Sequence, residues 1–288
     1  MKVRFLLTAA LAVFFSFSPA LARDKGTKLR FAFATDVHMN AGYTENRLER
    51  FKLALSKIKE ENVDFIVFGG DLNDVSSAEN YHDRETSEKL FEVFKKTVEA
   101  TGLEYYPAIG NHDRFFDGCT DCDGAEMYER FFGKSYRTFE KAGVRFFILN
   151  SVQKRKGASG YFVGEEQLEW LRNELASVPA STPVVVSTHV PVYSMYYPVV
   201  EGRYAFLDVI ANYRELLDAF KAHNLRLVLQ GHQHLHEELL LQDVNYVTGG
   251  AVCANWWKGE HHGTKEGFLV VDVDENNQFS WSYIIVNC

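Results

Sequence analysis

The chain has 288 residues and a formal net charge of −8, and 46% of its residues are hydrophobic. This length and apolar content suffice for one large α/β domain with a full core. The acidic balance argues against a protein that coats nucleic acid, because such binding depends on Lys and Arg that neutralise phosphates. We therefore expect no stable nucleic-acid complex.

The N-terminal segment has the layout of a secretory signal peptide. Two basic residues precede an apolar stretch over residues 5–17, and small residues stand at Ala20 and Ala22. This pattern predicts a signal peptide over residues 1–22 that is cleaved after Ala22. The alternative is an uncleaved membrane anchor, but the apolar stretch is shorter than the roughly 20 residues that span a bilayer. We therefore predict a periplasmic or secreted protein, not bound to a membrane, in which residues 23–288 form a single domain.

Strands and helices alternate along most of the chain. Apolar segments rich in β-branched and aromatic residues indicate strands, and apolar residues spaced three and four apart indicate helices. Strands are expected over residues 29–35, 64–68, 105–109, 136–140, 144–149, 184–187, 226–229, 239–241, 246–248, 268–273 and 279–286. Helices are expected over residues 47–60, 85–100, 165–176 and 211–223, and long loops over residues 150–160 and 190–207. The alternation implies βαβ units and the strand-rich tail implies antiparallel pairing, so the sequence predicts a mixed sheet.

Acidic, amide and imidazole side chains follow five of these strands at the point where each strand ends. They are Asp36, His38, Asp71, Asn111, His189, His232 and His234. Ligands of open α/β sheets gather beyond the carboxyl ends of the strands, and donors of these types suit Zn, Fe or Mn. Seven side chains exceed the needs of one tetrahedral site, so two metal ions that share a carboxylate are predicted. The glycines before Asp71, Asn111 and His232 let the backbone approach such a site closely.

Taken in order, these motifs resemble the signature of the calcineurin-like metallophosphoesterases. The matching residues are Asp36-x-His38, Gly70-Asp71, Gly110-Asn111-His112-Asp113, His189 and Gly231-His232-x-His234. The resemblance implies a four-layer αββα sandwich with two mixed β-sheets. It also implies two divalent or trivalent ions of Fe, Mn or Zn. One ion is then held by Asp36, His38, Asp71 and His234, and the other by Asp71, Asn111, His189 and His232, with Asp71 as the bridge.

The same resemblance implies a metal-dependent phosphoric ester hydrolase that cleaves mono- or diesters of a small phosphorylated substrate. A hydroxide that bridges the two metal ions attacks phosphorus, and the ions neutralise the phosphoryl oxygens. His112 then faces the leaving group and stabilises its charge or donates a proton, and Asp113 fixes the orientation of His112. In the alternative reading, His112 is only the neighbour of a metal-bound Asn111.

One position differs from a branch of this superfamily, the purple acid phosphatases. Purple acid phosphatases carry a tyrosine three residues after the bridging aspartate, whereas this chain has Asp74 at that position. A tyrosinate-bound ferric ion is therefore not expected, and Asn73 or Asp74 is expected to support the site or a turn. The pattern is more similar to the bacterial class III cyclic nucleotide phosphodiesterases, but these motifs are shared with many phosphatases and do not fix the substrate.

Candidate substrate-binding residues lie outside the signature. Arg114 follows the third motif and is a candidate to bind a phosphate oxygen, while Tyr193 and Tyr196 lie on the loop after His189, where aromatic rings could stack on a substrate. The alternatives are a surface arginine and a loop that merely packs over the sheet. Two other functions stay open: a phospholipid or sphingolipid phosphodiesterase, which needs an apolar groove near this loop, and a non-catalytic metal-binding interaction protein.

Four cysteines remain after the predicted cleavage site. In an oxidising compartment an even number suggests two disulfides. The pairs favoured are Cys119–Cys122 and Cys253–Cys288. Half of a zinc site and a redox pair are the alternatives for Cys119 and Cys122, but the chain contains no second CxxC to complete a zinc cage.

Overall fold

A computed structural model describes residues 26–41, 44–75, 82–117, 119, 122–204 and 208–286, without the side chains of residues 44 and 45. The predicted signal peptide over residues 1–22 lies outside these ranges, so its cleavage stays a prediction. Within the described ranges, no helix combines the length and the apolar character needed to cross a bilayer.

The first sheet has five strands and mixes both directions of pairing. Its strands are β1 (Thr27–Ala34), β2 (Phe65–Phe68), β3 (Glu104–Pro107), β10 (Gly267–Asp274) and β11 (Phe279–Ile285). In the order β11-β10-β1-β2-β3, the last three strands run parallel, and β10 pairs antiparallel with both β1 and β11. The parallel pairs are joined through α1 (Thr44–Glu60) and α2 (Arg84–Glu99), as the alternating pattern predicts.

The second sheet has six strands in the order β4-β5-β6-β7-β9-β8. These are β4 (Arg137–Lys141), β5 (Val144–Ile148), β6 (Pro183–Ser187), β7 (Asn224–Gln230), β8 (His236–Leu241) and β9 (Val244–Gly249). Strands β5, β6, β7 and β9 are parallel, while β4 and β8 are antiparallel edge strands. The β4–β5 hairpin turns at Ala142 and Gly143, whose φ angles of 47° and 72° are those of a type I′ turn.

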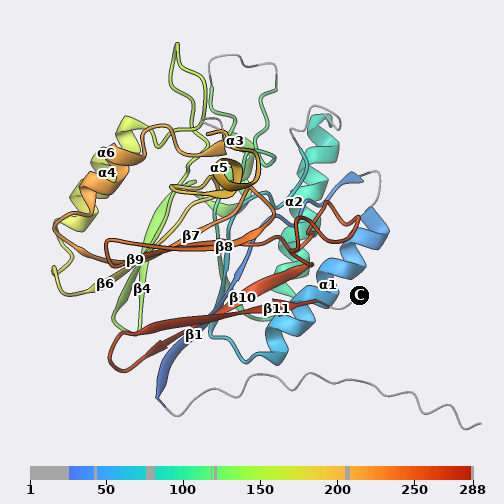
Figure 1. Cartoon of the computed structure of the whole chain (residues 1–288). Helices are drawn as coiled ribbons and strands as arrows, with labels where there is room; N and C mark the ends of the chain where they lie inside the picture. The colour runs from blue at the N-terminus through green and yellow to red at the C-terminus, as the bar shows by residue number, and fades with distance from the viewer. Residues whose placement is uncertain are drawn as a thin grey trace, which may run out of the picture.

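The two sheets pack face to face and helices cover both outer faces, which gives four layers (Figure 1). Between the sheets, Phe31 of β1 meets Phe146 of β5 edge-on, with ring centroids 5.3 Å apart. On the outer face of the first sheet, Phe68 of β2 packs against Phe94 of α2 at 5.2 Å. Helices α4 (Glu165–Leu175) and α6 (Tyr213–Ala219) cover the second sheet. The predicted αββα sandwich with two mixed sheets is therefore confirmed.

Three elements differ from the sequence-based expectation. Helix α3 (Glu126–Phe132) was not predicted, and α5 (Tyr196–Val200) lies inside the stretch 190–207 that was expected to be a loop. Both helices are too short for a periodic apolar pattern to build up. Helix α6 is also shorter than predicted, because the N–H of Phe220 donates to the carbonyl of Leu217, three residues back, and the helical ladder ends there.

Candidate metal centre

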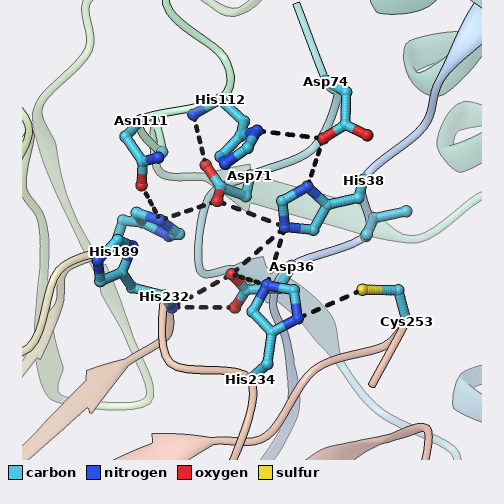
Figure 2. Close-up of polar contacts among 12 residues, drawn as sticks. Asp36, His38, Asp71, Asp74, Asn111, His112, His189, His232, His234 and Cys253 are labelled. Carbon is cyan, nitrogen blue, oxygen red and sulfur yellow. Dashed lines mark hydrogen bonds and ion pairs between the residues drawn. The ribbon is translucent and has the colours of Figure 1, made fainter. Parts of the chain in front are cut away.

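The seven predicted ligands come together where strands of both sheets end (Figure 2). The first sheet supplies Asp36 and His38 after β1, Asp71 after β2 and Asn111 after β3, and the second sheet supplies His189 after β6 and His232 and His234 after β7. Parallel strands present their carboxyl ends at one edge of a sheet. The site is therefore a product of the topology, and both sheets are needed to complete it.

The first cluster consists of Asp36, His38, Asp71 and His234, all buried. One ligand atom of each residue lies within 4.8 Å of the corresponding atoms of the other three. Nε2 of His38 is 2.9 Å from Nε2 of His234 and 3.4 Å from Oδ2 of Asp71, while Oδ1 of Asp36 is 3.3 Å from Nε2 of His234. Two imidazoles and two carboxylates thus point at one small volume.

The second cluster consists of Asp71, His189 and His232, with Asn111 beside them. Nε2 of His189 lies 3.2 Å from Oδ2 of Asp71 and 3.0 Å from Oδ1 of Asn111. The same Oδ2 of Asp71 faces His38 of the first cluster. Asp71 therefore stands between the two clusters, at the position of a bridging carboxylate.

At the centre, several residues adopt a backbone conformation that residues other than glycine rarely take. Positive φ angles of 50° to 71° occur at Asp36, His38, Asp71, His232 and His234. Such strain persists only where the surrounding structure over-determines it, and it concentrates at functional sites. A Cβ atom on Gly110 would overlap the Asp71 carboxylate, and one on Gly231 would overlap the Thr35 hydroxyl. The predicted close approach of backbone at these glycines is present.

The imidazoles are held in the orientation that a metal ligand needs. Nδ1 of His38 lies 2.5 Å from Oδ1 of Asp74, Nδ1 of His189 lies 2.9 Å from the carbonyl of Gly69, and Nδ1 of His234 lies 2.6 Å from the carbonyl of Ala254. Each Nδ1–H donates to these oxygens, which turns the Nε2 atom of each ring into the cluster.

The charges of the cluster also fit a bound cation. Burial favours the neutral carboxyl group, yet the neighbouring His234 lowers the pKa of Asp36, and His189 holds the pKa of Asp71 well below its usual range. In return, Asp71 raises the pKa of His189 to about 9 despite the burial of that ring. Protonated histidines thus supply the positive charge that these buried carboxylates require, and a metal ion would supply it in their place. The donor set therefore fits the metal ions that the resemblance implies.

Asp74 connects this centre to His112. Oδ1 of Asp74 faces both Nδ1 of His38 and, at 3.2 Å, Nδ1 of His112, while Oδ2 accepts a hydrogen bond of 3.1 Å from Arg47. Burial lowers the pKa of His112, but the charges of Asp71 and Asp74 outweigh it and raise that pKa. His112 therefore shares the Asp74 carboxylate with His38.

The expected contact between Asp113 and the His112 ring is replaced by that of Asp74. The Asp113 carboxylate is fully buried and accepts hydrogen bonds from the N–H groups of Leu72, Asn73 and Gly110. These bonds join the loop after β2 to the loop after β3. Asp113 thus holds the backbone that carries Asp71 and Asn111, and its carboxylate is used for these bonds instead of for orienting His112.

A cleft of about 300 Å³ opens on the centre. Its lining includes Asp71, His112, His232 and His234, together with Tyr196, Tyr197, Glu201, Asp208, Gln233, Trp256, His261 and His262. Of the predicted substrate residues only Tyr196 lines it. The Arg114 guanidinium packs on the Phe116 ring and donates to the carbonyl of Asp123. Tyr193 packs against Tyr213 and Tyr246.

Two further residues of the cleft contact predicted ligands. Oδ1 of Asp208 lies 3.3 Å from Nε2 of His232, and the Trp256 ring lies against His234 with centroids 4.2 Å apart. Neither belongs to a motif. The Trp256–Trp257 pair is the only local signal that the sequence offers for them.

Three cysteines lie among the described residues, namely Cys119, Cys122 and Cys253. Cys119 and Cys122 form the predicted disulfide. Cys253 is buried, has no disulfide partner among the described residues, and its Sγ lies 3.7 Å from Nδ1 of His234. Its predicted partner Cys288 lies outside the described residues, so that pairing stays a prediction.

Comparison with known proteins agrees with this geometry. A model of the calcineurin-like phosphoesterase family matches residues 29–236. The chain therefore belongs to the calcineurin-like phosphoesterase family, and it is a metal-dependent phosphoric ester hydrolase. No curated protein matches the sequence.

Solved structures show that the fold is shared with distant proteins. A dimetal phosphatase of Danio rerio is similar with a TM-score of 0.65 at 14% identity, over 91% of this chain and 97% of that chain. GAP50, the anchor in the inner membrane complex of Plasmodium, is similar with a TM-score of 0.57 at 16% identity, over 91% of this chain and 85% of that chain. The protein TT1561 of Thermus thermophilus is similar with a TM-score of 0.51 at 13% identity, over 91% of this chain and 100% of that chain.

Proposed function

We propose that the protein is a periplasmic or secreted phosphoesterase that hydrolyses phosphate mono- or diesters at a centre of two metal ions of Fe, Mn or Zn. The observation that carries the proposal is the position of Asp71, whose Oδ2 faces His38 of one cluster and His189 of the other. One ion would be held by Asp36, His38, Asp71 and His234, and the other by Asp71, Asn111, His189 and His232. When bound, the ions lower the pKa of water and neutralise charge on phosphoryl oxygens.

The residues of the chain have separate tasks in this reaction. In hydrolysis, a bond forms between the oxygen of water and phosphorus while the bond from phosphorus to the ester oxygen breaks. The departing oxygen takes a proton, and His112 is the group placed to supply it. Because Nδ1 of His112 faces Asp74, Nε2 is the atom that gives up the proton. Asp74 keeps His112 charged and aimed at the cleft.

Secretion is supported by the layout of residues 1–22, with its basic start, apolar stretch and small residues at the cleavage position. The Cys119–Cys122 disulfide is in keeping with an oxidising compartment. Mass spectrometry of the protein isolated from its own cells tests this. A mature chain that begins at Arg23 is expected, and an intact N-terminus on cytoplasmic protein would contradict the proposal.

Catalysis is tested with p-nitrophenyl phosphate and bis-p-nitrophenyl phosphate after addition of Mn, Zn or Fe. Hydrolysis of at least one ester, with two metal ions per chain by elemental analysis, is the expected result. Asp71→Asn is the matched variant, because it keeps the shape of the bridging side chain and removes its charge. Two bound ions without turnover of either ester would favour a non-catalytic metal-binding protein.

A further inference from the structure

An apolar groove of about 430 Å³ adjoins the metal cleft. One wall is α5 and the residue before it, and the other is the start of β8 with Leu235. Figure 1 draws α5 in the upper half of the molecule, above β7 and β8. The hydrogen bond from the Met195 N–H to Oε1 of Glu237, 2.8 Å long, joins the two walls. The groove is therefore a fixed feature of this surface.

Helix α5 presents apolar side chains to solvent, which is unusual for a surface helix. Its sequence is YYPVV, and none of its residues is buried. Met195, Val199 and Val200 are 48%, 73% and 59% exposed. Met195 and Val199 are four residues apart in one helical turn and so share a face. A contiguous apolar patch of this kind marks a binding surface.

The groove and the metal cleft share one boundary. Tyr196 and His262 line both of them, and Tyr196 Oη lies 2.6 Å from Nε2 of His262. A molecule whose phosphate lies at the metal cluster would have to cross this pair to reach the groove, and both side chains lie at the surface where it could do so.

The residues that line the groove indicate which kind of chemical group it can bind. Its polar lining residues already contact other groups: the Glu237 carboxylate accepts the Met195 N–H, the His236 ring contacts Thr248 and Glu238, and the His262 ring contacts Tyr196. The lining contains neither lysine nor arginine to bind a second phosphate. A protein partner is less suited, because stable interfaces bury about 800 Å² on each side, whereas this patch is built from three exposed apolar side chains.

We propose that this groove binds the alkyl chain of a lipid phosphoester whose phosphate lies at the metal centre. This inference rests on the proposed phosphoesterase function and names its substrate class. The chain is held by burial of its methylene groups against Val199, Val200 and Leu235, and Tyr196 marks the point where the polar head ends.

The test uses whichever p-nitrophenyl ester the wild-type protein hydrolyses and measures competitive inhibition by methyl-, butyl- and octylphosphonate, each below its micelle concentration. All three carry the same phosphonate for the metal centre and differ only in chain length. A fully buried methylene strengthens binding roughly fourfold, and an open groove shields only part of the chain. The inhibition constant is therefore expected to fall at least about tenfold from methyl to octyl.

The double variant Val199→Ser/Val200→Ser should reduce this ratio to within about threefold, because the wall of the groove loses its apolar surface. Both side chains are exposed, so the fold does not depend on them. Leu240→Ser is the matched control, since Leu240 is 71% exposed on β8 and does not line the groove. It should keep the wild-type ratio.

Equal inhibition by all three phosphonates, or a double variant with the wild-type ratio, would overturn the groove proposal while leaving the phosphoesterase standing. A wild-type dimer that the double variant converts to a monomer would show that a second copy covers the patch, and would overturn it as well. Absence of ester hydrolysis by wild-type protein with both metal ions bound would instead remove the proposed function, and this inference with it.

Discussion

His112 is the residue whose role can be separated most cleanly from metal binding. It is 3.2 Å from Asp74 through Nδ1 and donates its backbone N–H to Oδ1 of Asp71, so the ring itself stands beside the cluster. His112→Ala is expected to lower kcat by about 10²–10⁴-fold for an alkyl ester, because the departing alkoxide needs a proton. The loss should be smaller for p-nitrophenyl phosphate, whose leaving group departs without one.

Elemental analysis of His112→Ala is the control for this prediction. The variant should retain two metal ions per chain, since the ring is not among the proposed ligands. Loss of metal, or an equal decrease in kcat for both leaving groups, would contradict the role of a proton donor.

Asp208 contacts the imidazole of His232. Its Oδ1 lies 3.3 Å from Nε2 of His232, and the Tyr161 ring meets the same imidazole edge-on. Carboxylates that contact metal-binding histidines raise metal affinity about 10–100-fold. Asp208→Asn should therefore lower the affinity for the ion at the cluster of Asp71, His189 and His232 by this factor. The affinity for the other ion should stay unchanged, and titration calorimetry measures both. Glu201→Gln, which changes another carboxylate of the same cleft, is the control and should bind both ions normally.

At the scale of elements, α2 shows how packing positions the site. Phe94 is fully buried and stacks on Phe51 of α1 at 5.3 Å, and it also contacts Phe68, at the end of β2. Phe94→Ala should lower the free energy of unfolding by about 3–5 kcal/mol, because it removes apolar contacts and leaves a cavity. Urea unfolding of the metal-free protein measures this change. Lys96→Ala on the exposed face of the same helix should change it by less than about 0.5 kcal/mol.

Elements with a long apolar pattern could be predicted from the sequence, and elements without one could not. The run of residues 29–35 is buried on both faces, and the strand observed there, β1, differs from its prediction by one or two residues at each end. Helix α5 has five apolar residues and no polar face, so nothing in its pattern separates it from a loop.

The same limit applies inside the site. The convergence of the seven candidate ligands could be predicted because they stand in motifs directly after strands, where topology brings them together. Asp113 is adjacent to His112 and was expected to orient it, yet the backbone turns the two side chains apart and Asp74 takes that place. Likewise, the approach of Asp208 to His232 follows from the folded path of a loop that carries no motif. Contacts of this kind depend on tertiary structure, which local patterns do not contain.

At the scale of the whole molecule, the metal centre joins the two sheets. Asp36, His38, Asp71 and Asn111 extend from the first sheet, and His189, His232 and His234 from the second. Without metal ions, buried carboxylates and imidazoles depend on protons for compensation. Each bound ion therefore stabilises the folded state, by about 2.7 kcal/mol at a free concentration one hundred times its Kd.

Removal of both metal ions with a chelator should therefore lower Tm by about 10–20 °C, given a shift of roughly 2–4 °C for each kcal/mol in a domain of this size. Differential scanning calorimetry of the wild-type protein before and after chelation measures the change, and added Mn or Zn should reverse it. Asp71→Asn is the matched variant, because the residue shared by both clusters loses its charge. Its Tm should respond weakly to chelator, and a wild-type Tm that chelation leaves unchanged would show that the two sheets do not depend on the ions for their association.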